Sequence, residues 1–359
     1  MTSQLTSPPV AGTPTRASKV ASRRDDTIGV LFGMALVGGV LADAWAHTNI
    51  LKTLEGFFTP WHGLLYGGFA ATAAWTWWLA FRHRREDARW WRTRWPAGYG
   101  LGAVGTLMFL GGGVADMLWH EIFGIETGLK AGLSPSHLTI AAGGALLLTS
   151  QLRSWWASGE GGWRSVTGML SAALGTMMAI VVIVGLTGIY TTAPTQALRP
   201  APDSPVAISP EAQAALGYFL ATVLLLIPFL LIHRRRADPG AATAITGVVG
   251  LFVMVQHEFP MPITAAIIGM IVGAAIVDVV LWRLDLVRGP QAPLRLPIAG
   301  AAFAAGIWTG HLTGLHLAAG VHWPPELWAG TVVLSAVLGA LLGVLAAGTP
   351  VPVPQPKSG

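Results

Sequence analysis

The chain contains no cysteine, and charged residues make up only 11% of its 359 amino acids. The absence of cysteine excludes disulfides, thiolate metal ligands and cysteine nucleophiles, so any metal would be held by histidine, carboxylate, methionine or backbone oxygen. The shortage of charge excludes an ordinary soluble globular protein, whose surface carries more charged residues. Hydrophobic residues make up 53% of the chain and the mean hydropathy is +0.57, which together predict an integral membrane protein.

Ten apolar segments are long enough to cross about 30 Å of hydrocarbon as helices. We therefore predict an all-α fold, a polytopic membrane bundle of about ten transmembrane helices arranged in five hairpins. The transmembrane domain spans 27–348 and lies between a disordered cytoplasmic tail at 1–26, rich in Ser, Thr, Pro and Ala, and a cytoplasmic C-terminal tail at 349–359. The predicted spans are 27–46, 61–81, 97–119, 136–153, 166–190, 211–233, 241–258, 262–282, 297–317 and 327–347.

The start of the chain also resembles a signal peptide, because Arg23 and Arg24 precede an apolar run and the small residues of A-D-A-W-A. We prefer a retained helix, since cleavage there would remove half of a motif that recurs intact later in the chain.

The basic residues predict the orientation in the cell membrane. Of the 22 Lys and Arg, all except Lys52, Lys130 and Arg199 lie in the tails or in the loops that follow the even-numbered spans. Positive residues favour the cytoplasmic side, so both termini are predicted to be cytoplasmic. Anionic headgroups of the lipid bilayer then account for the isoelectric point near 10, and no nucleic acid partner is expected.

Two stretches place an Asp and a His four residues apart at the end of an apolar helix, and a second His after a Thr-Pro or Ser-Pro that opens the next helix. Positions i and i+4 lie about 40° apart around a helix, so each Asp and its first His can face one point. Each hairpin is therefore predicted to present one carboxylate and two imidazoles together near the outer membrane face. The first set is Asp43, His47 and His62, called here the Asp43 triad; the second is Asp116, His120 and His137, called the Asp116 triad.

The two motif copies match Asp43 to Asp116, His47 to His120, Thr59-Pro60 to Ser134-Pro135, and His62 to His137. This alignment predicts that at least two hairpins are internal repeats. The paired glycines near these helices, such as Gly38-Gly39 and Gly143-Gly144, predict close contact between helix backbones, because a bilayer supplies no hydrophobic drive for association.

Three further side chains are candidates for the same site. A looser copy of the motif, V-Q-H-E-F-P-M-P, places His257 and Glu258 before the turn of another hairpin. We predict His257 as a metal ligand, and Glu121 and Glu258 as groups that orient a ligand or move a proton. Asp278 lies nearer the cytoplasmic end of its helix and is expected to pair locally with Arg283.

A single Asp-x-x-x-His pair can be explained as a hydrogen bond that fixes a helix end. Two copies with carboxylates inside apolar helices favour metal binding or proton handling, because buried ionisable groups are costly in a bilayer. A ligand set made only of His and carboxylate suits Cu(II), Fe(II), Zn(II) or Mn(II), and the Irving–Williams order favours copper, with iron or zinc as alternatives.

Two classes of function fit these residues. The first is a copper or non-haem iron oxidoreductase that acts on a small or lipid-soluble substrate and draws on an electron donor or partner subunits. The alternative is a multi-pass transporter or metal-ion permease that uses the same polar cluster as a binding site or proton relay.

The Asp116 triad is similar to the metal-binding motif in the C subunit of the membrane-bound copper monooxygenases that oxidise methane and ammonia. The resemblance covers one hairpin, and in that family the second His follows after fewer residues. It implies that Asp116, His120 and His137 are copper ligands and that partner subunits take part in the activity.

Overall fold

The computed structural model describes residues 20–50, 58–124, 128–198, 208–235, 238–288 and 294–348. Within these ranges the regular structure is helical, which confirms the all-α prediction. The α-helices are α1 (Arg23–Asn49), α2 (Pro60–Phe81), α3 (Trp90–Thr93), α4 (Gly100–Phe123), α5 (Leu129–Leu133), α6 (Pro135–Leu148), α7 (Ser150–Ser158), α8 (Trp163–Ile180), α9 (Pro210–Arg235), α10 (Ala241–Gln256), α11 (Ile263–Arg288), α12 (Arg295–Ala319) and α13 (Pro325–Ala347).

Six of the helices in the described ranges are long and apolar enough to cross a membrane, so the chain is a multi-pass membrane protein. They are α1, α4, α8 with its 3-10 extension to Leu186, α9, α11 to Asp285, and α13. Helix α10 is apolar but shorter, and the predicted span 136–153 is divided between α6 and α7. The larger count of ten spans stays a prediction.

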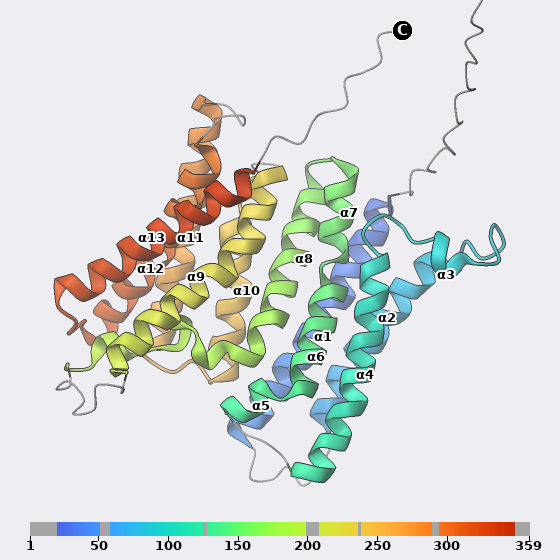
Figure 1. Cartoon of the computed structure of the whole chain (residues 1–359), viewed down its shortest axis with the longest axis horizontal. Helices are drawn as coiled ribbons and strands as arrows, with labels where there is room; N and C mark the ends of the chain where they lie inside the picture. The colour runs from blue at the N-terminus through green and yellow to red at the C-terminus, as the bar shows by residue number, and fades with distance from the viewer. Residues whose placement is uncertain are drawn as a thin grey trace, which may run out of the picture.

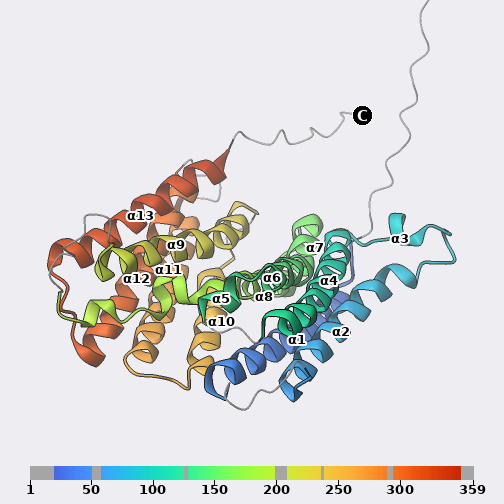
Figure 2. The ribbon, with the colours of Figure 1, turned by 60° about the horizontal axis from the view of Figure 1, so that its bottom comes forward.

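The helices form two groups joined through α10 (Figures 1 and 2). One group pairs α1 with α2 and α4 with α6, and α8 packs against α1, α6 and α7. The other pairs α11 with α12, α12 with α13, and α13 with α9. Helix α10 contacts both α8 and α11, and the carboxyl ends of α1 and α4 lie at the end of the molecule where α5 lies (Figure 1).

Helix α1 begins at Arg23, four residues before the predicted boundary at residue 27. Ser22 and Asp25 form a capping box, in which the Ser22 hydroxyl accepts from the Asp25 amide and the Asp25 carboxylate accepts from the Ser22 amide, both at 3.1 Å. Residues 1–19 and 349–359 of the predicted tails lie outside the described residues.

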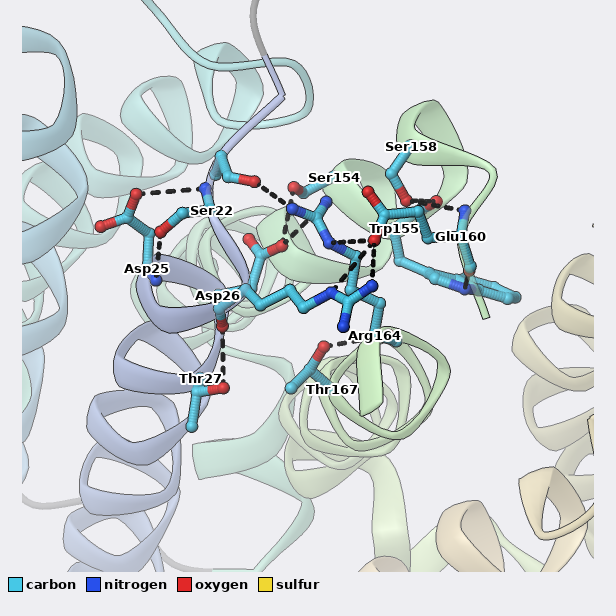
Figure 3. A network of polar contacts seen from close by, with 12 residues as sticks. Ser22, Asp25, Asp26, Thr27, Ser154, Trp155, Ser158, Glu160, Arg164 and Thr167 are labelled. Carbon is cyan, nitrogen blue, oxygen red and sulfur yellow. Dashed lines mark hydrogen bonds and ion pairs between the residues drawn. The ribbon is translucent and has the colours of Figure 1, made fainter. Parts of the chain in front are cut away.

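A polar network anchors the start of α1 to its neighbours (Figure 3). Asp26 is fully buried and accepts hydrogen bonds from the Tyr99 hydroxyl at 2.8 Å and the Ser154 hydroxyl at 3.0 Å. The guanidinium of Arg164, also buried, lies 3.7 Å from the same carboxylate. These partners belong to the start of α4, to α7 and to α8, so one carboxylate joins four helices at this end.

An exposed ion pair borders this network. Arg23 donates two hydrogen bonds to one carboxylate oxygen of Glu160, at 3.1 and 2.9 Å. These bonds hold the pKa of the Glu160 carboxyl below its ordinary value.

Glycines line the closest helix contacts, as predicted from their pairing in the sequence. A Cβ added to Gly39 would lie 2.6 Å from the backbone of Leu64 on α2, and one added to Gly143 would lie 2.5 Å from the Phe109 nitrogen on α4. Between α11 and α12, the Cα atoms of Gly269 and Gly310 face each other so closely that a Cβ on either would overlap the other's carbonyl oxygen. Such contacts let backbones pack without intervening side chains.

Asp278 caps a neighbouring helix instead of pairing with Arg283. Its carboxylate accepts from the backbone amides of Ala242 at 3.1 Å and Thr243 at 2.9 Å, and from the Thr243 hydroxyl at 2.7 Å. Helix α10 begins at Ala241 after Gly240, which has no side chain to cap it, so α11 supplies the cap. Arg283 lies over the Trp282 ring, 5.1 Å from its centroid.

Candidate metal centres

The Asp43 triad is built by the last turns of α1 and the first turn of α2. His47 Nδ1 lies 3.6 Å from Asp43 Oδ2, and His62 Nε2 lies 3.3 Å from Asp43 Oδ1. One ligand atom from each of the three side chains falls within 4.8 Å of the other two. The structure therefore brings together the three residues that the sequence motif predicted for this hairpin.

The Asp116 triad has the same construction at the junction of α4 and α6. His120 Nε2 lies 3.4 Å from Asp116 Oδ2, and His137 Nε2 lies 3.4 Å from Asp116 Oδ1. Its ligand atoms also lie within 4.8 Å of one another. Asp116 is 2% exposed, so this carboxylate is buried in the bundle.

The helix starts explain how the second His of each triad is placed. Thr59 caps α2 and Ser134 caps α6, each followed by a Pro at the first helical position. The cap hydroxyl accepts the backbone amide of the triad histidine itself, at 3.1 Å for His62 and 3.3 Å for His137. The hydroxyl-Pro-x-His sequence thus fixes the imidazole at the third position of the helix, where it faces the preceding helix end.

Hydrogen bonds outside the ligand atoms orient the Asp116 triad. The Ser136 hydroxyl donates to Asp116 Oδ1 at 2.9 Å. His137 Nδ1 lies 2.7 Å from the Ser134 hydroxyl, and His120 Nδ1 lies 3.3 Å from the Gly124 carbonyl oxygen. With Nδ1 of both rings bonded outward, both Nε2 atoms face the carboxylate, which is the arrangement typical of metal-binding histidines.

The Asp43 triad differs at its carboxylate. Asp43 Oδ1 is buried and accepts no hydrogen bond. The position that corresponds to Ser136 is Trp61, whose ring packs edge-on against Trp45 with centroids 5.5 Å apart. The carboxylate of Asp43 therefore lacks the hydroxyl donor that orients Asp116.

The carboxylate–imidazole distances within the triads are compatible with a shared metal ion. The carboxylate–imidazole separations of 3.3 to 3.6 Å are longer than the 2.7–3.2 Å of a good N–H···O hydrogen bond. Two ligand atoms that each lie about 2.1 Å from one tetrahedral metal ion are roughly 3.4 Å apart. Each triad could therefore hold a metal ion.

Tyr66 lies between the two triads and was not identified from the sequence. It is one helical turn after His62, with the two rings 6.3 Å apart, and a Cβ added to Gly113 on α4 would lie 2.8 Å from its hydroxyl oxygen. The two centres are therefore neighbours across the contact of α2 with α4.

The other predicted site residues do not belong to either triad. His257 stacks on Tyr190 with centroids 4.2 Å apart, and Glu258 accepts a hydrogen bond from the Trp45 indole at 3.3 Å. Glu121 is exposed on α4. Neither of the clusters found among the described residues contains them, and their roles stay predictions.

The triads can each supply one carboxylate and two imidazoles to an ion, and three protein ligands leave coordination positions for water or substrate. Comparison with known proteins adds no further assignment, because no protein-family model, curated protein or solved structure matches the chain.

Proposed function

We propose that this multi-pass membrane protein binds one transition metal ion in each triad and acts as an oxidoreductase on a small or lipid-soluble substrate. Copper is the favoured metal and non-haem iron the redox-active alternative; zinc also accepts a ligand set of His and carboxylate but does not itself change oxidation state. The similarity of the Asp116 triad to the copper monooxygenase motif supports the same choice.

The observation that carries this proposal is the recurrence of one ligand geometry. Two separate hairpins each hold an Asp oxygen and two His nitrogens within 4.8 Å of one another, which is close enough to bind one ion.

Redox chemistry is favoured because two imidazoles and one carboxylate, with open positions, are the ligands by which non-haem iron enzymes activate oxygen. A site at the ends of membrane helices is open to an apolar substrate that enters from the lipid. Reducing equivalents would come from an electron donor or a partner subunit.

The shared motif of the two hairpins and the distribution of basic residues support two finer proposals. We infer that the α1–α2 and α4–α6 hairpins are internal repeats within a bundle of about ten spans. We also infer that the triads lie on the outer side of the membrane with both chain ends in the cytoplasm.

Metal analysis of detergent-purified protein tests the proposal. We expect about two transition metal ions per chain in the native protein, about one in Asp43→Asn or Asp116→Asn, and none in the double variant, because Asn keeps the volume but loses the anionic ligand. Glu326→Gln, which changes an exposed carboxylate on α13, is the matched control and should keep both ions.

A metal content that is the same in the native protein and both Asp variants would refute the proposal. Metal-depleted protein that still moves a solute across liposome membranes would instead establish the transporter alternative.

A further inference from the structure

We propose that the two triads are unequal: the Asp116 triad is a tightly held, resident metal centre, the Asp43 triad is an exchangeable centre, and Ser136 is the positioning residue that makes the difference. This inference rests on the proposed function, because it assigns an order of affinity to the same two sites.

The first argument is the support given to Asp116. Ser136 donates to Asp116 Oδ1 at 2.9 Å, and Ser136 itself is buried, so water does not compete for this bond. A second hydroxyl, that of Ser134, lies 3.2 Å from Ser136 and 2.7 Å from His137 Nδ1. One short stretch at the start of α6 therefore orients both the carboxylate and one imidazole.

The second argument is the absence of this support at Asp43. The corresponding helix start places Trp61 where Ser136 stands, and Asp43 Oδ1 is buried without a hydrogen-bond donor. The carboxylate of the Asp43 triad is consequently not held in one orientation by a donor of this kind.

The third argument is exposure. The side chain of Asp43 is 17% exposed against 4% for Asp116, and that of His47 is 26% exposed against 6% for His120. The histidine at the start of the second helix is instead less exposed in the Asp43 triad: the side chain of His62 is 10% exposed, and that of His137 is 28% exposed. Water and incoming ligands therefore reach the carboxylate and the helix-end histidine more readily in the Asp43 triad.

Together these features predict an order of binding. Groups that orient metal ligands typically change metal affinity by about 10- to 100-fold, and a preorganised site loses less freedom when the ion binds. The Asp116 triad should fill first and release its ion last, whereas the Asp43 triad, with an unsupported oxygen and greater access, should exchange its ion and admit external ligands.

The test uses full-length protein with one triad at a time. His47→Ala with His62→Ala leaves the Asp116 triad, and His120→Ala with His137→Ala leaves the Asp43 triad. After removal of metal, Co(II) or Cu(II) is titrated against a competing chelator. We expect the protein with only the Asp116 triad to bind at least about 10-fold more tightly.

Ser136 is then changed within each background. In the protein with only the Asp116 triad, Ser136→Ala should weaken binding by about 10-fold or more and shift the visible absorption of bound Co(II), and Ser136→Thr, which keeps the hydroxyl, should restore both. In the protein with only the Asp43 triad, Ser136→Ala should change neither. A purely structural role for Ser136 would alter thermal stability without moving the Co(II) spectrum.

The outcomes separate this inference from the function on which it rests. Equal affinities, the reverse order, or unchanged binding after Ser136→Ala would overturn the inference while leaving metal binding intact. Failure of both single-triad proteins to bind either metal would overturn the proposed function itself.

The native chain provides a second readout if the Ser136→Ala protein does not fold. A chelator should remove one ion faster than the other, and the slowly released ion should be the one missing from Asp116→Asn. Release of both ions at one rate would also contradict the inference.

Discussion

Asp26 and Arg164 show how single residues hold a buried charge in this protein. The carboxylate has two hydroxyl donors and the guanidinium as neighbours, and both charged side chains are buried. Removing the cation would leave the anion without its counter-charge, which is much more costly than losing an exposed pair.

We predict that Arg164→Ala lowers the free energy of unfolding by about 3–5 kcal/mol. Arg23→Ala, which removes only the exposed partner of Glu160, should have a much smaller effect because solvent screens that pair. Thermal or denaturant unfolding of both variants in detergent gives the comparison. Adding Asp26→Asn to Arg164→Ala should recover part of the loss, and equal effects of the two Arg variants would contradict the prediction.

At this scale the sequence identified the candidate ligands but not the residues that contact them. Asp116 and His120 are four residues apart on one helix, so their proximity follows from helix geometry alone. Ser136 contacts Asp116 across a hairpin, and Tyr66 on α2 lies beside Gly113 on α4. Both contacts depend on how the helices pack, which the sequence pattern does not give. A Ser directly before a repeated His is the one local signal that could have drawn attention to Ser136.

At the scale of helices, the glycine contact between α11 and α12 determines how closely these two elements pack. We predict that Gly269→Ala destabilises the protein, because the added methyl group would overlap the carbonyl oxygen of Gly310 and force the helices apart. Gly247→Ala on α10 is the matched control: no heavy atom lies within 4 Å of its added Cβ, so replacing a helical Gly should be neutral or stabilise by about 0.5–1 kcal/mol.

Thermal unfolding in detergent distinguishes the two glycine variants. A Gly269→Ala protein as stable as Gly247→Ala would show that the α11–α12 contact tolerates separation.

Helix positions were predictable from apolar length, whereas their ends often were not. The capping box of Ser22 and Asp25 begins α1 before its apolar run, and α10 takes its cap from Asp278, 36 residues later in the chain. The first of these signals is local and readable in S-R-R-D. The second depends on the packing of α11 beside α10, which hydropathy does not reveal.

At the scale of the whole molecule, the distribution of Lys and Arg predicts which ends of the helices face the cytoplasm. The absence of cysteine makes this directly testable, because any single Cys substitution creates the only thiol in the chain. We predict that Ala88→Cys, exposed between α2 and α3, reacts with a membrane-impermeant maleimide only from the cytoplasmic side.

Ala197→Cys, exposed after the 3-10 turns that follow α8, should react only from the opposite side. Labelling intact cells and inverted membrane vesicles separates the two cases. Reaction of both thiols from one side would contradict the predicted topology. Reaction of Ala88→Cys only from outside and Ala197→Cys only from the cytoplasm would show that the orientation is the opposite of the predicted one.

The helix start that carries the second His of each triad has a consequence for protein engineering. Cap, proline and ligand are contiguous in Thr59 to His62 and in Ser134 to His137, and the remaining ligands come from the last turns of the helix before them. All three side chains of one triad thus come from a single hairpin. Asp-x-x-x-His closing one helix and Ser-Pro-Ser-His opening the next could therefore be grafted into an unrelated helical scaffold to create a carboxylate–imidazole cluster there.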